Sequence, residues 1–250
     1  MQLENKNVVI VGGSRGVGRV IAKTANDNGA RVLVAARRSD SLEEIAAEIP
    51  GIETLKIDAA QEGSPEIVFE TLRPDLLVLC GGAIPHMAPV HEHTWDDFSR
   101  NWNSDVKSSF LFCRAALSAP LAPGATVILL SSGAAIGGST MSGGYAGAKR
   151  MQMFMADYCQ IESDRAHLGL RFIALAPGRI MPTTDLGKAA VAGYASRLGV
   201  SEADFVQGMD YSITPQNVAD ALIEIAAEPA IMTGNVFIVT GKGVEPYPAP

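Results

Sequence analysis

The chain has 250 residues, 47% of them hydrophobic, and its 20 basic and 27 acidic residues give a formal net charge of −7. This length suits a single α/β domain over residues 1–250. There is no basic cluster to indicate nucleic-acid binding, and no apolar run approaches the roughly 20 residues of a membrane span. The N-terminus lacks a signal-peptide pattern, and the three cysteines are widely spaced. We therefore expect a cytoplasmic protein with reduced thiols.

Short runs rich in Val, Ile and Leu alternate with helix-length segments along the chain. We predict strands at 7–11, 31–35, 53–57, 75–79, 125–130, 170–175 and 235–239. We predict helices at 16–28, 41–48, 64–72, 94–118, 143–164 and 215–227. Thr214 is the expected N-cap of the last helix, with Pro215 at its first position. Nearly continuous apolar strands are typical of parallel strands covered on both faces. The order predicts a doubly wound parallel α/β sheet of the Rossmann type, with about seven strands and helices on both faces.

A glycine-rich turn follows the first predicted strand. Gly12, Gly16 and Gly18 have the spacing G-x-x-x-G-x-G at the junction of strand and helix. Glycine permits unusual dihedral angles and a close approach of the backbone to a pyrophosphate, and the N–H groups of a helix N-terminus bind phosphate. The pattern therefore predicts a dinucleotide site. Its predicted contacts are Gly12, Ser14, Arg15, Gly16, Val17 and Gly18.

The end of the second strand indicates which dinucleotide binds. Sites for NAD usually place an acidic residue about 20 positions after the glycines, where it binds the ribose hydroxyls. Here that position is Ala36, and Arg37 and Arg38 follow it. Arg37 could clamp a 2′-phosphate, and Arg15 could cover the same phosphate or the adenine. Asp58, after the third strand, is a candidate partner for the adenine amino group. We predict NADP, although Arg37 and Arg38 could instead be solvated loop charges.

Tyr145 and Lys149 are four residues apart in a predicted helix, and Ser132 precedes Tyr145 by thirteen residues. Residues at this helical spacing lie on one face. An ammonium favours the phenolate, so we expect Lys149 to lower the pKa of Tyr145 from its usual value of about 10. Ser132 would hold a substrate oxygen beside the phenol. The trio predicts a proton-transfer site for a carbonyl or an alcohol, although Tyr and Lys also occur at this spacing by chance.

Together these features resemble the short-chain dehydrogenase/reductase family over essentially the whole chain. The glycine turn resembles the family's TGxxxGxG, with Val11 in place of threonine, and Ser132, Tyr145 and Lys149 fall on its catalytic positions. The resemblance implies that Tyr145 exchanges the proton and that Lys149 also binds the nicotinamide ribose. It further implies cofactor contacts by Gly81, Pro177, Gly178, Ile180 and Thr183. A homodimer or homotetramer is usual in this family, so we expect one here.

The chain departs from the family pattern at two places. The family's NNAG after the fourth strand is Leu79-Cys80-Gly81-Gly82 here, a change that we expect to repack the central sheet. Asp105 stands where the family carries a catalytic asparagine, whose backbone carbonyl holds a water bonded to the lysine. A backbone role survives the change to aspartate. The added carboxylate would stabilise the Lys149 ammonium and oppose a phenolate, and so reduce or shift activity.

Substrate recognition is poorly defined by the sequence. The stretch 181–213 interrupts the alternation of strands and helices, and we expect it to form a cap that lines the substrate pocket together with residues 83–97. His86, His91 and His93 lie in the latter stretch without the spacing typical of metal ligands. We therefore predict no metal site and interpret these histidines as solvated loop residues or as one polar contact to substrate.

The function predicted from these features is hydride transfer between NADP(H) and a small-molecule carbonyl or alcohol, with Tyr145 as proton donor or acceptor. One alternative is an epimerase or dehydratase on the same scaffold, which the short length disfavours. The other is an NADP(H)-binding sensor or scaffold with weak or no turnover, which the change to Asp105 favours.

Overall fold

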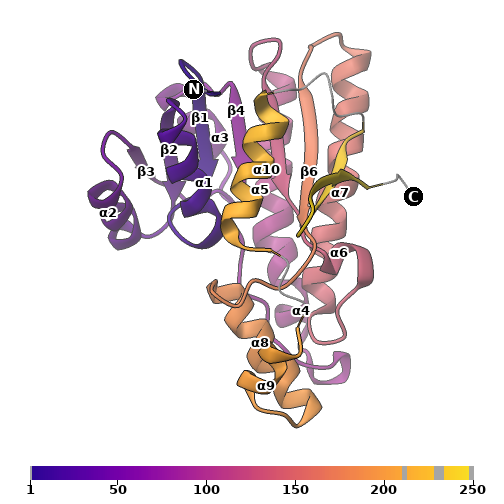
Figure 1. Ribbon diagram of the computed structural model, residues 1–250. Coiled ribbons are helices and arrows are strands. Elements are labelled where there is room, and N and C mark those ends of the chain that lie inside the picture. Colours follow the sequence, from indigo (N-terminus) through magenta and orange to yellow (C-terminus); the bar gives the residue numbers. More distant parts are fainter. Residues whose placement is uncertain (1, 210–212, 228–233, 248–250) are drawn as a thin grey trace.

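The computed structural model describes residues 2–209, 213–227 and 234–247, which form one eight-stranded sheet flanked by helices (Figure 1). The strands are β1 (Asn7–Val11), β2 (Arg31–Ala36), β3 (Glu53–Lys56), β4 (Leu76–Leu79), β5 (Thr126–Leu130), β6 (Arg171–Pro177), β7 (Val236–Thr240) and β8 (Gly243–Pro246). Their spatial order is β3-β2-β1-β4-β5-β6-β7-β8, and β1 to β7 run parallel. The predicted doubly wound parallel α/β fold is confirmed.

The sheet has one strand more than the seven expected. β8 pairs antiparallel with β7, in a register from Phe237↔Pro246 to Thr240↔Gly243. Its sequence, GVEP, has one apolar branched residue and ends in proline, which is tolerated at the edge of a sheet. Such a short and exposed strand has no hydrophobic pattern by which to recognise it.

Helices cover both faces of the sheet, as predicted. They are α1 (Gly16–Asp27), α2 (Ser39–Glu48), α3 (Ser64–Thr71), α4 (Trp95–Asn101), α5 (Lys107–Ser118), α6 (Ala134–Gly137), α7 (Gly143–Arg165), α8 (Asp185–Leu198), α9 (Glu202–Gln207) and α10 (Pro215–Ala227). Successive strand residues point to opposite faces. Val8 and Ile10 therefore pack in the core under α1, α2 and α10, whereas Val9 and Val11 pack in the core under α3, α5 and α7. No helix in the described part of the chain is long and apolar enough to cross a membrane.

The single helix predicted over 94–118 is divided into three parts. Thr94 caps α4 by accepting a hydrogen bond from the Asp97 backbone N–H at 3.1 Å. A π-helical segment, Trp102–Val106, then separates α4 from α5. Such bulges insert extra backbone into a helix and change the direction in which side chains project. This segment carries Asp105, which is buried.

The stretch 181–213 contains two helices, α8 and α9, which stand below the sheet in Figure 1. The Thr184 hydroxyl caps α8 by accepting from the Gly187 N–H at 3.0 Å. Tyr194 of α8 stacks on Phe205 of α9, with ring centroids 6.1 Å apart. These contacts pack α8 and α9 into a two-helix unit within the predicted cap; residues 210–212 lie outside the described residues.

Candidate active site

A cleft of about 750 Å³ lies at the carboxyl ends of the parallel strands. It is lined by the last residues of β1, β2, β5 and β6 (Val11, Ala36, Leu130 and Pro177) together with parts of α8 and α9. In open α/β sheets, the crevice at this edge is the usual place for ligands. The cleft contains both the glycine turn and the predicted proton-transfer trio.

The glycine turn has the backbone geometry that a dinucleotide requires. Gly12 has φ +86°, and a Cβ there would lie 2.2 Å from the Gly81 Cα, so only glycine fits. A Cβ on Gly18 would lie 2.7 Å from the Gly12 carbonyl oxygen. Gly16, with φ +55°, begins α1, whose N-terminus has no side-chain cap and no acidic residue in its first turn. The N–H groups there lack a side-chain acceptor from the cap and suit a phosphate.

Three arginines lie along the same part of the cleft, and two of them are paired with carboxylates. Arg38 forms an ion pair with Asp40, and Arg15 Nη1 lies 3.3 Å from Asp185 Oδ2 at the start of α8. Within the described ranges no acidic side chain pairs with Arg37, which is exposed and lines the cleft. Of these three arginines, Arg37 is therefore the best placed to donate hydrogen bonds to a phosphate group in the cleft.

The Ser132, Tyr145 and Lys149 side chains lie in the wall of this cleft. Ser132 follows β5, and its Oγ accepts from the Ala134 N–H at 3.2 Å. Tyr145 and Lys149 are buried on α7, and the Lys149 Nζ lies 5.6 Å from the centre of the Tyr145 ring. The helical spacing thus brings the phenol and the ammonium into one pocket, as the sequence predicted.

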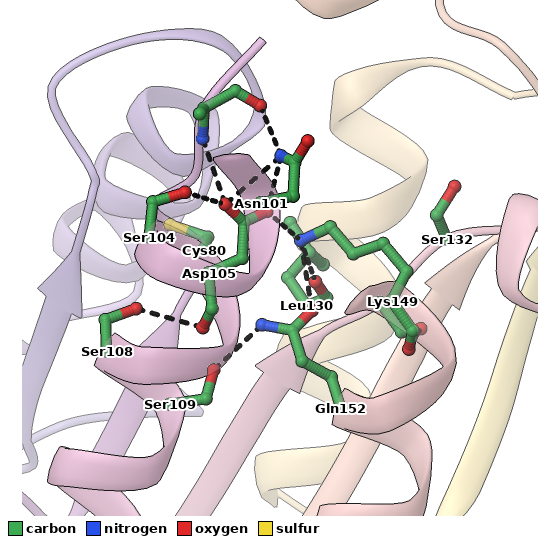
Figure 2. A network of polar contacts seen from close by, with 12 residues as sticks. Cys80, Asn101, Ser104, Asp105, Ser108, Ser109, Leu130, Ser132, Lys149 and Gln152 are labelled. Carbon is green, nitrogen blue, oxygen red and sulfur yellow. Dashed lines mark hydrogen bonds and ion pairs between the residues drawn. The ribbon is translucent and has the colours of Figure 1, made fainter. Parts of the chain in front are cut away.

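The Lys149 ammonium is bound by three oxygen atoms (Figure 2). Its Nζ lies 3.2 Å from Asp105 Oδ2 and 3.0 Å from both Gln152 Oε1 and the Leu130 carbonyl oxygen. The Gln152 amide in turn donates to Ser109 Oγ at 2.8 Å. Ser132 stands apart from these contacts in Figure 2.

Asp105 is 1% exposed, and its carboxylate accepts several hydrogen bonds besides the ion pair with Lys149. Oδ1 accepts from the Ser104 hydroxyl at 2.6 Å and from the Ala83 N–H at 3.0 Å. The Asn101 amide lies 3.3 Å from the same oxygen. These hydrogen bonds and the ion pair with Lys149 satisfy the buried carboxylate, as a buried charge requires. Its backbone carbonyl accepts from the Ser108 hydroxyl at 3.1 Å.

Comparison with known families decides the identity of this fold and cleft. The family model described as short chain dehydrogenase matches residues 6–195, which include the glycine turn, Asp105 and the Ser132, Tyr145 and Lys149 trio. The chain belongs to the short-chain dehydrogenase/reductase family. The resemblance noted from the sequence is thereby confirmed.

The similar proteins are distant in sequence. L-fucose dehydrogenase of Oryctolagus cuniculus is 24% identical over 94% of this chain and 84% of its own length. Carbonyl reductase family member 4 of Danio rerio is 25% identical over 93% of this chain and 95% of its own. Among solved structures, 3-ketoacyl-(acyl-carrier-protein) reductase from Brucella melitensis, complexed with NADH, superposes with a TM-score of 0.79. That structure is 20% identical, over 96% of this chain and 98% of its own, and so shows the fold alone.

The pKa of Tyr145 is raised above its usual value and not lowered as expected. Burial raises the pKa of the phenol, and this outweighs the lowering by Lys149 and by a hydrogen bond from Ser132. The Asp105 carboxylate raises the pKa further. The predicted net lowering is therefore wrong, because the sequence shows the neighbouring cation but not how deeply the ring is buried. Burial alone would lower the pKa of Lys149, yet Asp105 and Tyr145 raise it above its usual value.

Most of the residues expected at the cofactor site lie in the cleft wall. Gly12, Ser14, Arg15, Gly16, Val17, Gly18, Arg37, Asp58, Gly81, Pro177, Gly178 and Ile180 all line it. Thr183 does not, and its neighbour Thr184 lines the cleft instead. The thiol of Cys80 donates to the Val11 carbonyl at 3.2 Å, and burial raises its pKa to about 12, so this group is not a nucleophile.

The polar residues around Lys149 were not predicted from the sequence. Gln152 follows Lys149 by three positions on α7, so helical spacing alone could have indicated their contact. Ser109 and Asn101 belong to other segments, and only the fold brings them to this network.

The three clustered histidines, His86, His91 and His93, are not among the residues that line the cleft, and His91 and His93 line a separate, smaller cavity. The His93 Nε2 lies 2.9 Å from the Ala88 carbonyl oxygen, and the rings of His86 and His93 meet edge to face at 5.5 Å. Nowhere in the described residues do three His, Cys, Asp or Glu side chains gather as a metal site would require.

Proposed function

We propose that this protein is an NADP(H)-dependent oxidoreductase that interconverts a ketone or aldehyde with the corresponding alcohol. The observation that carries the proposal is that Ser132, Tyr145 and Lys149 line the same cleft as the uncapped glycine turn. A nicotinamide dinucleotide held there would supply or accept the hydride. Family membership and the names of the relatives, a sugar dehydrogenase and a carbonyl reductase, support this class of reaction.

Each residue of the trio has a separate role in this proposal. The Tyr145 hydroxyl gives its proton to the substrate oxygen during reduction and removes it during oxidation. Ser132 donates a hydrogen bond to the same oxygen, so that negative charge is stabilised as it develops. Lys149 favours the phenolate electrostatically, against the opposing effects of burial and Asp105. Because burial raises the pKa of Tyr145, the phenol is protonated at neutral pH, as reduction requires, but it is a weaker acid than free tyrosine.

The test of this function is direct consumption of cofactor. The protein is mixed with NADPH or NADH and a panel of ketones, aldehydes, quinones and reducing sugars, and the loss of nicotinamide absorbance is followed. We expect consumption of NADPH with at least one carbonyl compound. Binding of NADPH without consumption over the whole panel would contradict the proposed reaction.

Arg37 is expected to set the preference for NADP over NAD. It lies at the cleft without an acidic partner among the residues described, and charge-assisted contacts to a phosphate are strong. We expect Arg37→Ala to weaken NADPH binding by about 10- to 100-fold and to leave NADH binding unchanged. Dissociation constants for both nucleotides, measured by titration of cofactor fluorescence, check this.

Arg38 offers a matched control, because the adjacent guanidinium already pairs with Asp40. Arg38→Ala should change the NADPH dissociation constant far less than Arg37→Ala. Equal losses in the two variants would show that the arginines act only through general charge.

A second candidate function is a nucleotide-binding sensor with weak turnover. The contacts of Lys149 favour it, since all three acceptors around the ammonium belong to the protein itself. The panel experiment separates the two functions, because a sensor binds NADPH and consumes none.

The remaining features of the proposal concern the cap and the assembly. We propose that 181–213 covers the substrate, since Leu186, Tyr194 and Phe205 of α8 and α9 line the cleft.

We also propose self-association through α5 and α7. Four large apolar side chains on these helices are exposed by half or more: Phe110, Phe154, Tyr158 and Ile161.

A further inference from the structure

Three oxygens of the protein surround the Lys149 ammonium, as many as it has N–H donors. Gln152 Oε1 and the Leu130 carbonyl accept hydrogen bonds at 3.0 Å, and the Asp105 carboxylate forms an ion pair at 3.2 Å. A cofactor ribose hydroxyl that is to bind Lys149 must therefore replace one of the three. Which acceptor is exchanged follows from how firmly each is held.

Asp105 and Leu130 are poor candidates for exchange. The Asp105 carboxylate is buried, and breaking its ion pair would leave an uncompensated charge on each partner. The Leu130 carbonyl belongs to the end of β5, so its position is fixed by the sheet. Neither acceptor can move away from Lys149 without disturbing the fold.

Gln152 is the remaining acceptor, and it is electrically neutral. It is 1% exposed and does not line the cleft, whereas Lys149, Asp105 and Leu130 do. Its Nε2 donates to Ser109 Oγ at 2.8 Å, which orients the amide so that Oε1 accepts from Lys149. Gln152 Oε1 thus contacts the Lys149 ammonium, as Figure 2 shows. Because Gln152 does not line the cleft, it competes for this ammonium with any ligand bound there.

We propose that Gln152 is a positioning residue that holds the Lys149 ammonium back from the cleft and thereby weakens nucleotide binding. Binding of the ribose then requires Lys149 to exchange Gln152 Oε1 for a ribose hydroxyl. The inference rests on the proposed function in so far as the cleft binds a nicotinamide nucleotide.

The test compares nucleotide dissociation constants in two variants of opposite effect. Gln152→Met has a similar volume and no acceptor oxygen, so one ammonium donor becomes available. We expect it to bind NADPH about tenfold more tightly, the worth of about one net hydrogen bond. Gln152→Glu places an anionic acceptor at the position of Oε1. We expect this variant to bind NADPH more weakly than the parent, by about tenfold or more. Binding is measured by cofactor fluorescence, and thermal melting confirms that each variant is folded.

Tighter binding is a result that a purely structural role cannot produce, since loss of packing weakens binding. Gln160→Met is the matched control: it makes the same change on α7, where Gln160 instead bonds the Leu170 carbonyl and the Phe172 N–H. Its NADPH dissociation constant should equal that of the parent. Unchanged or weaker binding by folded Gln152→Met would overturn the inference. If this variant does not fold, tighter or equal binding by Gln152→Glu would do the same. A parent protein that binds neither NADPH nor NADH overturns the proposed function, and the inference with it.

Discussion

Replacement of Tyr145 by Phe is expected to remove nearly all turnover and to leave nucleotide binding intact. The change removes only the phenolic oxygen from a ring that is 8% exposed, so the packing of α7 is retained. General acid–base catalysis contributes about 10²- to 10⁴-fold, and the rate should fall by that factor. The measurement is kcat with a carbonyl substrate found in the panel, beside the NADPH dissociation constant.

Tyr158 provides the control for this substitution. It lies on the same helix, is 55% exposed and does not line the cleft. Tyr158→Phe should retain the kcat of the parent. If Tyr145→Phe also kept most of its rate, the proton would have to come from another group, and the assignment of Tyr145 would fail.

The fold could be predicted because most of its strands have a hydrophobic pattern that is visible in the local sequence. NVVIV, TVILL and VFIVT are each apolar at four of five positions, as expected of strands buried on both faces. The start of the last helix could also be predicted from local sequence: Thr214 Oγ1 accepts from the Asn217 N–H at 3.3 Å, as an N-cap should. β8 was missed because it is defined by its pairing with β7 and not by a hydrophobic pattern of its own. The π-helical segment was missed because it continues a helical sequence without a break that the residues reveal.

The cleft could be predicted only in part. Gly12, Tyr145 and Lys149 were found because glycine turns and helical spacing leave marks in the sequence. The contacts around Lys149 could not be predicted in this way. Leu130 contributes a backbone oxygen, and Ser109, which binds Gln152, lies forty residues before Lys149 along the chain. The net pKa shift of Tyr145 escaped for a related reason. Its sign depends on the burial of the ring, which only the assembled fold determines.

Asp105 is one of the two departures from the family pattern noted in the sequence, and it contacts Lys149 directly. The neutral asparagine usual at this position would leave the Lys149 charge free to act on Tyr145. Here the carboxylate lies 3.2 Å from the ammonium and opposes its effect on the phenol. The same charge stabilises the buried lysine, so catalysis and stability make conflicting demands on this position.

Replacement of Asp105 by Asn is expected to shift the pH dependence of alcohol oxidation towards lower pH. Oxidation requires the deprotonated phenol, and the Asp105 carboxylate is one of the causes that raise the pKa of Tyr145. Without it the pKa falls, so the ascending limb of the rate profile begins at lower pH. Initial rates across the pH range, for the parent and the variant, measure the shift.

The same position is expected to matter for stability. Asp105→Ala leaves the Lys149 ammonium buried without a counter-charge, and we expect the free energy of unfolding to fall by about 3–5 kcal/mol. Asp105→Asn should lose less, because its amide oxygen still accepts a hydrogen bond from the ammonium. Denaturant unfolding measures the loss in both variants, with Asp96→Asn as an exposed control on α4.

Superimposable pH profiles for Asp105→Asn and the parent would show that the carboxylate does not act on Tyr145, whatever its effect on stability.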